Sequence, residues 1–118
     1  MSGSVPTGGL PLAEVLSRWE AIVHRWRLDP DERSALLGGF EPGPVDRVET
    51  YGTAGSERRM RLVVELEPIL HRVHPSIARV RRWLRAENAS LDGRTPIEVM
   101  ASSPEWTRWL IDSVGLSA

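Results

Sequence analysis

The chain of 118 residues contains no cysteine and no lysine. Without cysteine it has neither a disulfide framework nor a thiolate metal site. All 15 of its basic residues are arginine, so it also lacks the lysine that a Walker-type phosphate loop or Schiff-base catalysis requires. These absences remove several classes of enzyme and metalloprotein, and we expect neither a metal nor a cofactor.

Long apolar runs are also missing. No stretch approaches the roughly 20 apolar residues that cross a bilayer, and the first ten residues lack the cationic and apolar regions of a secretory signal. Glycine, serine and proline interrupt residues 1–10, which are therefore expected to form a flexible tail. Together these features predict a cytoplasmic protein.

The chain carries none of the G-x-S-x-G, H-E-x-x-H or G-x-G-x-x-G motifs. His71 and His74 are three residues apart, but no third ligand stands at a convincing spacing, so we interpret them as cations at the end of a helix. Glu65 and Glu67 should point to different helix faces, which prevents them from acting as an acid and base pair. The sequence therefore predicts a protein that is not an enzyme.

Charge is unevenly distributed along the chain. Residues 1–55 hold five arginines against eight acidic residues, and residues 56–118 hold ten against eight. A net negative first half disfavours simple DNA binding, which depends on cations that neutralise phosphates. The arginines between Arg79 and Arg85 form either a solvated face or a surface for an acidic or phosphate-bearing partner.

Glu20 and His24 lie one helical turn apart, so their side chains are expected to form a pair.

Apolar residues recur at helical spacing along most of the chain, without strand-like alternation or internal repeats. The pattern is clearest over residues 12–27. Glycine and proline leave room for only one short helix, over 45–51, between residues 40 and 55. The further helices are expected over residues 29–38, 56–73, 75–85, 96–101 and 104–114. The sequence therefore predicts an all-α fold, a compact helical bundle.

Local signals mark the helix ends. Asp29-Pro30 and Thr95-Pro96-Ile97-Glu98 each place a capping residue before a proline, Ser56 is expected to cap the long helix, and Pro75 to lie in the first turn of the next one. An interior proline costs about 3 kcal/mol, so Pro68 is expected to bend or split the long helix.

Gly115 is expected to end the last helix. The short remainder of the chain would then be a free tail.

Five tryptophans accompany a single tyrosine and a single phenylalanine. Trp19 and Trp26 share the apolar stripe of residues 12–27 and are expected in the core. Trp83 lies one residue off the stripe of its helix, so it either closes the core or faces a partner. Trp106 and Trp109 lie on a short amphipathic helix that could present one of them outward, where tryptophan is a common interface hot spot.

The run WLRAENASLDGRTPIEVM at residues 83–100 resembles the pattern WLxxPNxxLxGxTPxxLL of the toxin-binding domain of the Xre/MbcA/ParS antitoxins. Glu87 stands where that pattern has proline. Residues 109–112 and Gly115 resemble the final helix and glycine-containing end of the domain. Residues 26–28 and 35–38 are similar to the opening of the same family.

The resemblance implies an antitoxin with a helix-turn-helix-like region over residues 11–73 and a toxin-binding domain over 74–118. Its partner would be a RES-domain toxin that consumes NAD or uses it for ADP-ribosyl transfer, and the antitoxin would form a homodimer within the complex. The C-terminal region would block the toxin's active site. The residues expected to contact the toxin are Asn88, Arg94, Trp106, Trp109, Gly115, Leu116, Ser117 and Ala118.

The family's N-terminal region often represses its own operon, which leaves a DNA-binding transcriptional regulator as the alternative function. The two helices would then cover residues 29–38 and 45–51, with Arg47 reaching the DNA. Because Arg47 stands among carboxylates, base recognition by this helix would be weak. A small enzyme that uses His71 or His74 is the third hypothesis.

Overall fold

The computed structural model describes residues 9–38 and 54–117. Within them there is no β-strand, only an isolated bridge between Asn88 and Arg94. The elements are α1 (Leu12–Arg25), α2 (Pro30–Leu36), α4 (Ala54–Val73), α5 (Ile77–Arg85), the 3₁₀ turn η3 (Ala89–Leu91), α6 (Pro96–Ser102) and α7 (Pro104–Ser117). The all-α prediction is confirmed. The helix expected over 45–51 and most of the expected tail lie outside the described residues.

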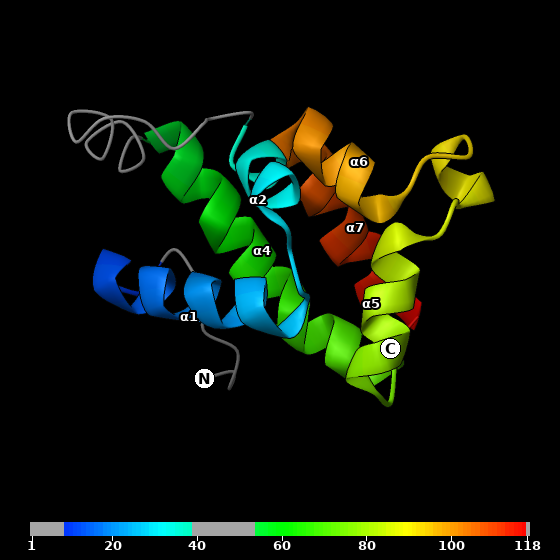
Figure 1. Cartoon of the computed structure of the whole chain (residues 1–118), viewed down its shortest axis with the longest axis horizontal. Helices are drawn as coiled ribbons and strands as arrows, with labels where there is room; N and C mark the ends of the chain where they lie inside the picture. Colours follow the sequence, from blue (N-terminus) through cyan, green and yellow to red (C-terminus); the bar gives the residue numbers. More distant parts are fainter. Residues whose placement is uncertain (1–8, 39–53, 118) are drawn as a thin grey trace.

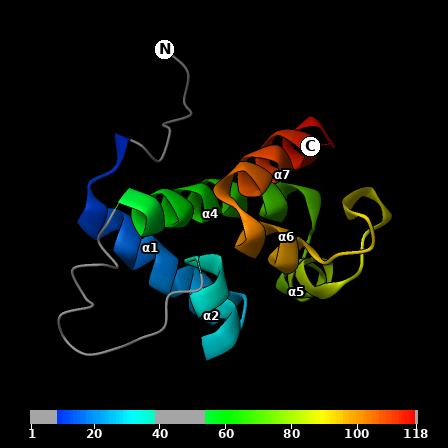
Figure 2. The same cartoon turned by 90° about the horizontal axis from the view of Figure 1, so that it is seen from above.

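The long helix α4 crosses the centre of the molecule (Figures 1 and 2). It packs against α1 along one side and α7 along another, while α6 contacts α7, α5 and α2. No helix within the described residues is long and apolar enough to cross a membrane.

One apolar core runs through these helices. Trp19 of α1 and Trp26, the residue that caps its end, are fully buried, as expected from their shared stripe, and they join the apolar residues of α4 in one core. The turn η3 and helices α5, α6 and α7 complete the core with Val80, Leu84, Leu91, Ile97, Val99, Met100, Leu110 and Ile111. Burial of this apolar surface is the main force that holds the bundle together.

The structure differs from expectation at Ser56 and Pro75, and it excludes a split of the long helix at Pro68. Pro68 does not split α4, which continues from Ala54 to Val73. Its ring lies on the exposed face, while Leu66 and Leu70 are buried, so packing offsets the lost hydrogen bond. Ser56 lies within α4, not before it. Ser76, and not Pro75, begins α5, since its Oγ accepts a hydrogen bond from Arg79 N at 3.2 Å.

The end of the chain also differs from expectation. Helix α7 continues through Gly115 to Ser117. The Cβ of another residue at Gly115 would meet nothing within 4 Å, so neither φ nor crowding requires glycine there. The last residues described therefore extend the helix instead of forming a loose tail.

The capping box predicted at Thr95 is confirmed, and the cap predicted at Asp29 is part of a second capping box. Asp29 accepts from Glu32 N at 2.8 Å and Asp29 N donates to the Glu32 carboxylate at 3.0 Å. Thr95 and Glu98 form the same reciprocal pair at the start of α6. Each box satisfies two backbone N–H groups that the helix itself leaves unpaired.

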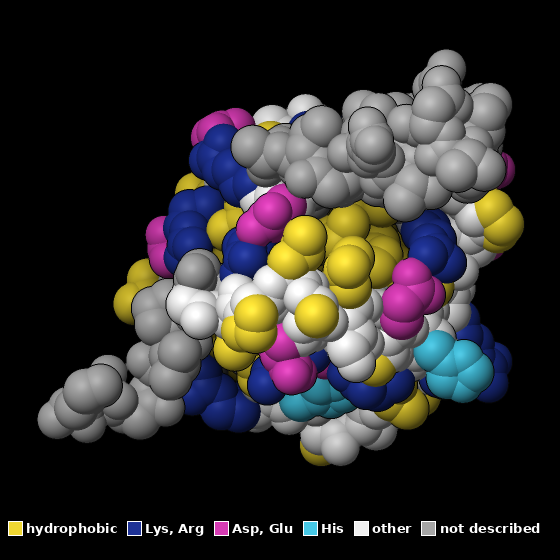
Figure 3. Space-filling view, turned by 90° about the vertical axis from the view of Figure 1, so that its left-hand side faces the viewer, with side chains coloured by type: hydrophobic (Ala, Val, Ile, Leu, Met, Phe, Trp, Pro, Cys, Tyr) yellow, Lys and Arg dark blue, Asp and Glu magenta, His cyan; other side chains and the backbone are white. Residues whose placement is uncertain are grey.

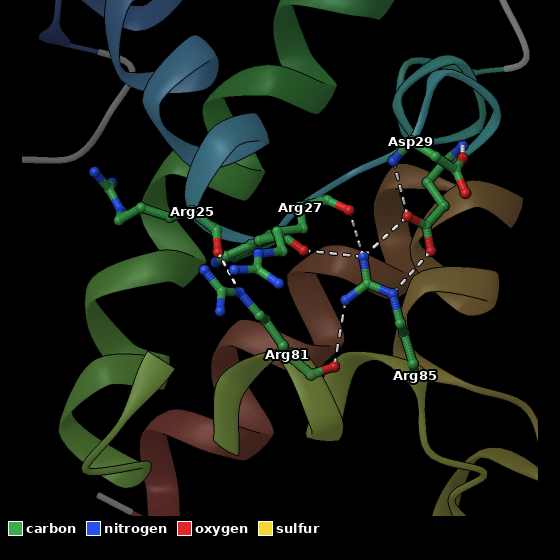
Figure 4. A network of polar contacts seen from close by, with 7 residues as sticks. Arg25, Arg27, Asp29, Arg81 and Arg85 are labelled. Carbon is green, nitrogen blue, oxygen red and sulfur yellow. Dashed lines mark hydrogen bonds and ion pairs between the residues drawn. The ribbon is translucent and has the colours of Figure 1, made fainter. Parts of the chain in front are cut away.

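A polar network joins the corner between α1 and α2 to α5 (Figure 4). The Arg85 guanidinium binds both oxygens of Glu32 at 2.9 and 3.1 Å. Its Nη2 also donates to the carbonyls of Trp26 and Arg27 at 2.9 and 3.0 Å, and Arg81 Nε donates to the Arg25 carbonyl at 2.8 Å. Carbonyls left unpaired at the end of α1 thus receive their donors from α5.

Two ion pairs of α1 complete its attachment. Arg25 pairs with the buried Glu67 of α4. Glu20 pairs with Arg33 of α2, so the expected pair with His24 is wrong. A partner on the neighbouring helix reaches Glu20 because α2 folds back against α1, which the spacing within one helix does not reveal.

We expect Arg85→Leu to lower the free energy of unfolding by about 2 kcal/mol, because it removes several charge-assisted hydrogen bonds at once and leaves Glu32 without its cation. Urea unfolding measures the change. Arg82→Leu is the matched control: it removes an exposed arginine from the same helix and should shift the value by less than about 0.5 kcal/mol. Equal losses in the two variants would contradict the importance of the network.

Candidate functional site

The loop of residues 88–94 is closed by hydrogen bonds around Asn88. Asn88 N donates to the Arg94 carbonyl at 3.1 Å, and the Asn88 carbonyl accepts from Leu91 N and Gly93 N, both at 2.9 Å. The Asn88 side chain accepts from Ser90 N at 2.9 Å. Asn88, predicted as a contact residue, is therefore engaged in shaping this loop.

Arg94, Trp106 and Trp109 form a continuous stack beside the loop. The Arg94 guanidinium lies 5.1 Å from the centroid of the Trp106 ring, a cation–π arrangement. The Trp106 and Trp109 rings meet edge to face at 5.6 Å. Trp109 remains 43% exposed, so the expectation that the last helix presents one tryptophan outward is confirmed.

Next to this stack lies a hollow of about 240 Å³. Its walls come from the end of α4, from α5, from the loop and from α7, and they consist of Val73, His74, Trp83, Asn88, Ser90, Leu91, Trp109, Leu110, Ser113 and Val114. The rings of His74 and Trp83 pack together with centroids 5.9 Å apart. We call the loop, the stack and this hollow the Trp109 face.

Uncharged groups dominate the hollow. Burial, and secondly the charge of Arg79, lower the pKa of His74, so its imidazole is neutral at neutral pH. Ser90, Ser113 and Asn88 contribute polar atoms among aromatic and aliphatic surfaces. The hollow therefore suits an uncharged, partly apolar side chain, since a charged one would lose its hydration without gaining a counter-ion.

The two histidines differ from each other. His71 lies in the last turn of α4, as expected of a cation at the helix end, and its Nε2 lies 3.5 Å from the Glu67 carboxylate. His74 follows the helix and packs on Trp83 instead. Within the described residues, no group of three His, Cys, Asp or Glu side chains could hold a metal ion. Both His74 and Trp83 are notable in the sequence, but only the fold brings the end of α4 and the middle of α5 together.

Helix α7 is held in place by Arg108, whose guanidinium binds both oxygens of Glu65 on α4 at 2.9 and 3.2 Å. The hydrogen bonds to Glu65 raise the pKa of Arg108. Glu67 serves Arg25 instead, so the two glutamates do point to different faces. The clamp sets the position of Trp109 one residue further along.

The other predicted contact residues lie towards the end of α7. Gly115 is half-buried, and Leu116 is 90% exposed. Ser117 is the last residue of the helix, while Ala118 and Arg47 lie outside the described residues. The structure thus brings Asn88, Arg94, Trp106 and Trp109 together and leaves the end of α7 as a separate apolar tip.

A larger apolar hollow of about 550 Å³ lies between α1, α2 and the first half of α4. Figure 3 shows hydrophobic side chains gathered on this side of the molecule. Its walls include the 42% exposed Leu16, but none of the described residues predicted to contact a partner. We therefore place the candidate site at the smaller hollow, where those residues converge.

Comparison with known families supports this choice. Residues 70–108 match the family model described as the antitoxin Xre/MbcA/ParS C-terminal toxin-binding domain. No curated protein and no solved structure matches the chain. The match runs from the end of α4 into α7, includes His74, Trp83 and the loop, and stops one residue before Trp109. It supports the antitoxin resemblance, and a domain of this kind implies a toxin as partner.

The lowered pKa of His74 predicts a stability that depends on pH. The unfolded chain takes up a proton near pH 6.5, whereas the folded chain resists it, so acidification below about 6.5 favours unfolding. We expect the free energy of unfolding to fall more for the wild type than for His74→Phe between about pH 7.5 and about pH 5.5. Urea titrations at both values test this, and equal falls would contradict it.

Proposed function

We propose that this chain is an antitoxin that binds a protein toxin through the Trp109 face and does no chemistry of its own. The observation that carries the proposal is the coincidence of two independent features. The region that matches a toxin-binding domain supplies six of the ten residues that line a hollow, and the exposed Trp109, the next residue after that region, stands at the edge of the hollow. Exposed aromatic rings beside a preformed hollow are typical of interface hot spots.

The architecture suits a binding role. Arg85, Arg108 and the two capping boxes hold the surrounding helices before any partner arrives, so little conformational entropy is lost on association. The closed loop of residues 88–94 adds a rigid rim. A stable complex needs more than about 1,000 Å² of buried surface, so neighbouring parts of α5 and α7 would contribute as well.

For the partner we propose a RES-domain toxin that consumes NAD or transfers ADP-ribose, as the family resemblance implies. The antitoxin would neutralise it by obstructing the active site with its C-terminal region. The exposed Leu116 at the tip of α7 supports a helical blocking element, in place of the extended tail expected from the sequence. A homodimer within the complex also rests on the resemblance.

The alternative function, a DNA-binding regulator of its own operon, depends on residues 45–51 and Arg47. These lie outside the described residues, so it stays a prediction. The first helix of the expected pair, α2, is present with its capping box.

Trp109→Ala should weaken binding to the toxin encoded beside this chain by at least about 30-fold, because a hot-spot residue contributes about 2 kcal/mol or more. Calorimetric titration of the purified proteins measures the loss. Leu16→Ala is the matched control, since Leu16 is equally exposed at 42% but lies at the other hollow. Unchanged affinity of the Trp109→Ala variant would rule out the Trp109 face as the toxin-binding surface.

Deletion of residues 115–118 tests the blocking element separately. We expect the shortened chain to retain most of its affinity, through the Trp109 face, and to lose neutralisation, because the tip of α7 no longer reaches the active site. Toxin activity in the presence of excess antitoxin is the measurement, with Leu116→Asp as a point variant of the same tip. Full neutralisation by both variants would show that inhibition does not depend on this end.

A further inference from the structure

Helix α1 ends in a tight reversal that normally requires glycine. Leu28 N donates to the Val23 carbonyl at 3.0 Å, and Arg27 N donates to the His24 carbonyl at 3.2 Å. This pair of bonds is a Schellman motif, whose left-handed position is usually glycine. Here that position is Arg27, with a φ of 53°. Its Cβ makes the conformation strained, so the arginine carries a cost that glycine would avoid.

The Arg27 side chain lines a hollow of about 510 Å³. The other walls are Glu20, Val23, His24, Leu28 and Arg81. Figure 4 shows Arg27 and Arg81 approaching from the end of α1 and from α5. Two guanidinium groups and an imidazole from two different elements thus share one polar hollow.

These two arginines differ from their neighbours in their partners. Arg25, Arg33 and Arg85 each bind a carboxylate, and Arg33 occupies Glu20, the one acidic residue of the hollow. Among the described residues, Arg27 has no hydrogen bond or ion pair from its side chain, and Arg81 uses only Nε, on the Arg25 carbonyl. The hollow therefore holds two guanidinium groups without carboxylates of their own.

We infer that this hollow binds a phosphate group, held by Arg27 and Arg81 with His24 beside them. Like charges in one hollow repel each other until an anion lies between them. At Glu32, the single guanidinium of Arg85 donates to both oxygens of the carboxylate. A phosphate offers further oxygens in a tetrahedral arrangement, so it can accept from two guanidinium groups and an imidazole together.

The site goes beyond the proposed antitoxin function, because no residue lines both this hollow and that of the Trp109 face. The phosphate has two sources with the same chemistry: the backbone of a nucleic acid, or a small phosphate compound. Arg27→Gly is the decisive variant. It removes the guanidinium while giving the reversal its preferred residue, so a loss of binding cannot be attributed to damage of the fold.

The full chain is titrated with inorganic phosphate at constant ionic strength, with chloride as the balancing anion, and backbone amide signals are followed by NMR. We expect saturable shifts at Arg27, Leu28 and Arg81. Arg27→Gly should weaken binding at least ten-fold and leave the thermal midpoint unchanged or higher. Arg82→Gln, which removes an exposed arginine of α5 outside the hollow, should stay within two-fold of the wild type.

Three results would overturn the inference. The first is the absence of a saturable shift at these residues, and the second is equal weakening of binding in Arg27→Gly and Arg82→Gln. The third is acetate binding as tightly as phosphate, which would indicate that the hollow binds a carboxylate of a protein partner.

A second experiment repeats the comparison with a short DNA duplex. Duplex binding that depends on Arg27 identifies a nucleic-acid backbone as the source, and phosphate binding without duplex binding identifies a small phosphate compound.

Discussion

The guanidinium of Arg85 closes the corner where α1 ends and α2 begins. Helix α1 leaves carbonyls unpaired at its end. A few residues later α2 begins with a capping box in which the Glu32 side chain accepts from the Asp29 backbone N–H. From α5, Arg85 donates hydrogen bonds to the carbonyls of Trp26 and Arg27 and to the carboxylate of Glu32. Because α5 also carries Trp83 and leads directly into the loop of residues 88–94, Arg85 helps to set the position of the candidate binding face, together with the buried Val80 and Leu84. The clamp between Arg108 and Glu65 does the same for α7.

Arginine has several distinct uses in this chain without lysine. In α1, α5 and α7 it forms bidentate ion pairs that fix one helix on another, for which a planar fork is better suited than an ammonium group. Arg94 instead lies over an aromatic ring. Arg27 and Arg81 have no carboxylate partner among residues 9–38 and 54–117. The run of arginines in α5, ambiguous in the sequence, is therefore divided: Arg81 and Arg85 serve the fold, while Arg79 and Arg82 are exposed.

Predictions succeeded where the interaction is short in range. The cap at Asp29 and the capping box at Thr95 involve residues three apart, and Trp19 and Trp26 share one stripe, so the local pattern was sufficient. Predictions failed where packing by distant helices decided the outcome. Helix α4 tolerates Pro68 because it is packed along its length, and Glu20 binds Arg33 because α2 folds back on α1. Gly115 continues a helix that a local rule would have ended.

The sequence by itself determined the all-α class, the helix starts at Asp29 and Thr95, the buried tryptophans of α1 and the resemblance of residues 83–100 to a toxin-binding domain. Each of these depends on residues within a few turns of one another. Only the tertiary structure decided which groups share a surface: His74 with Trp83 and Trp109, and Arg27 with Arg81. The members of each set lie on different elements, and their distances are set by how the helices pack, which no spacing along the chain encodes.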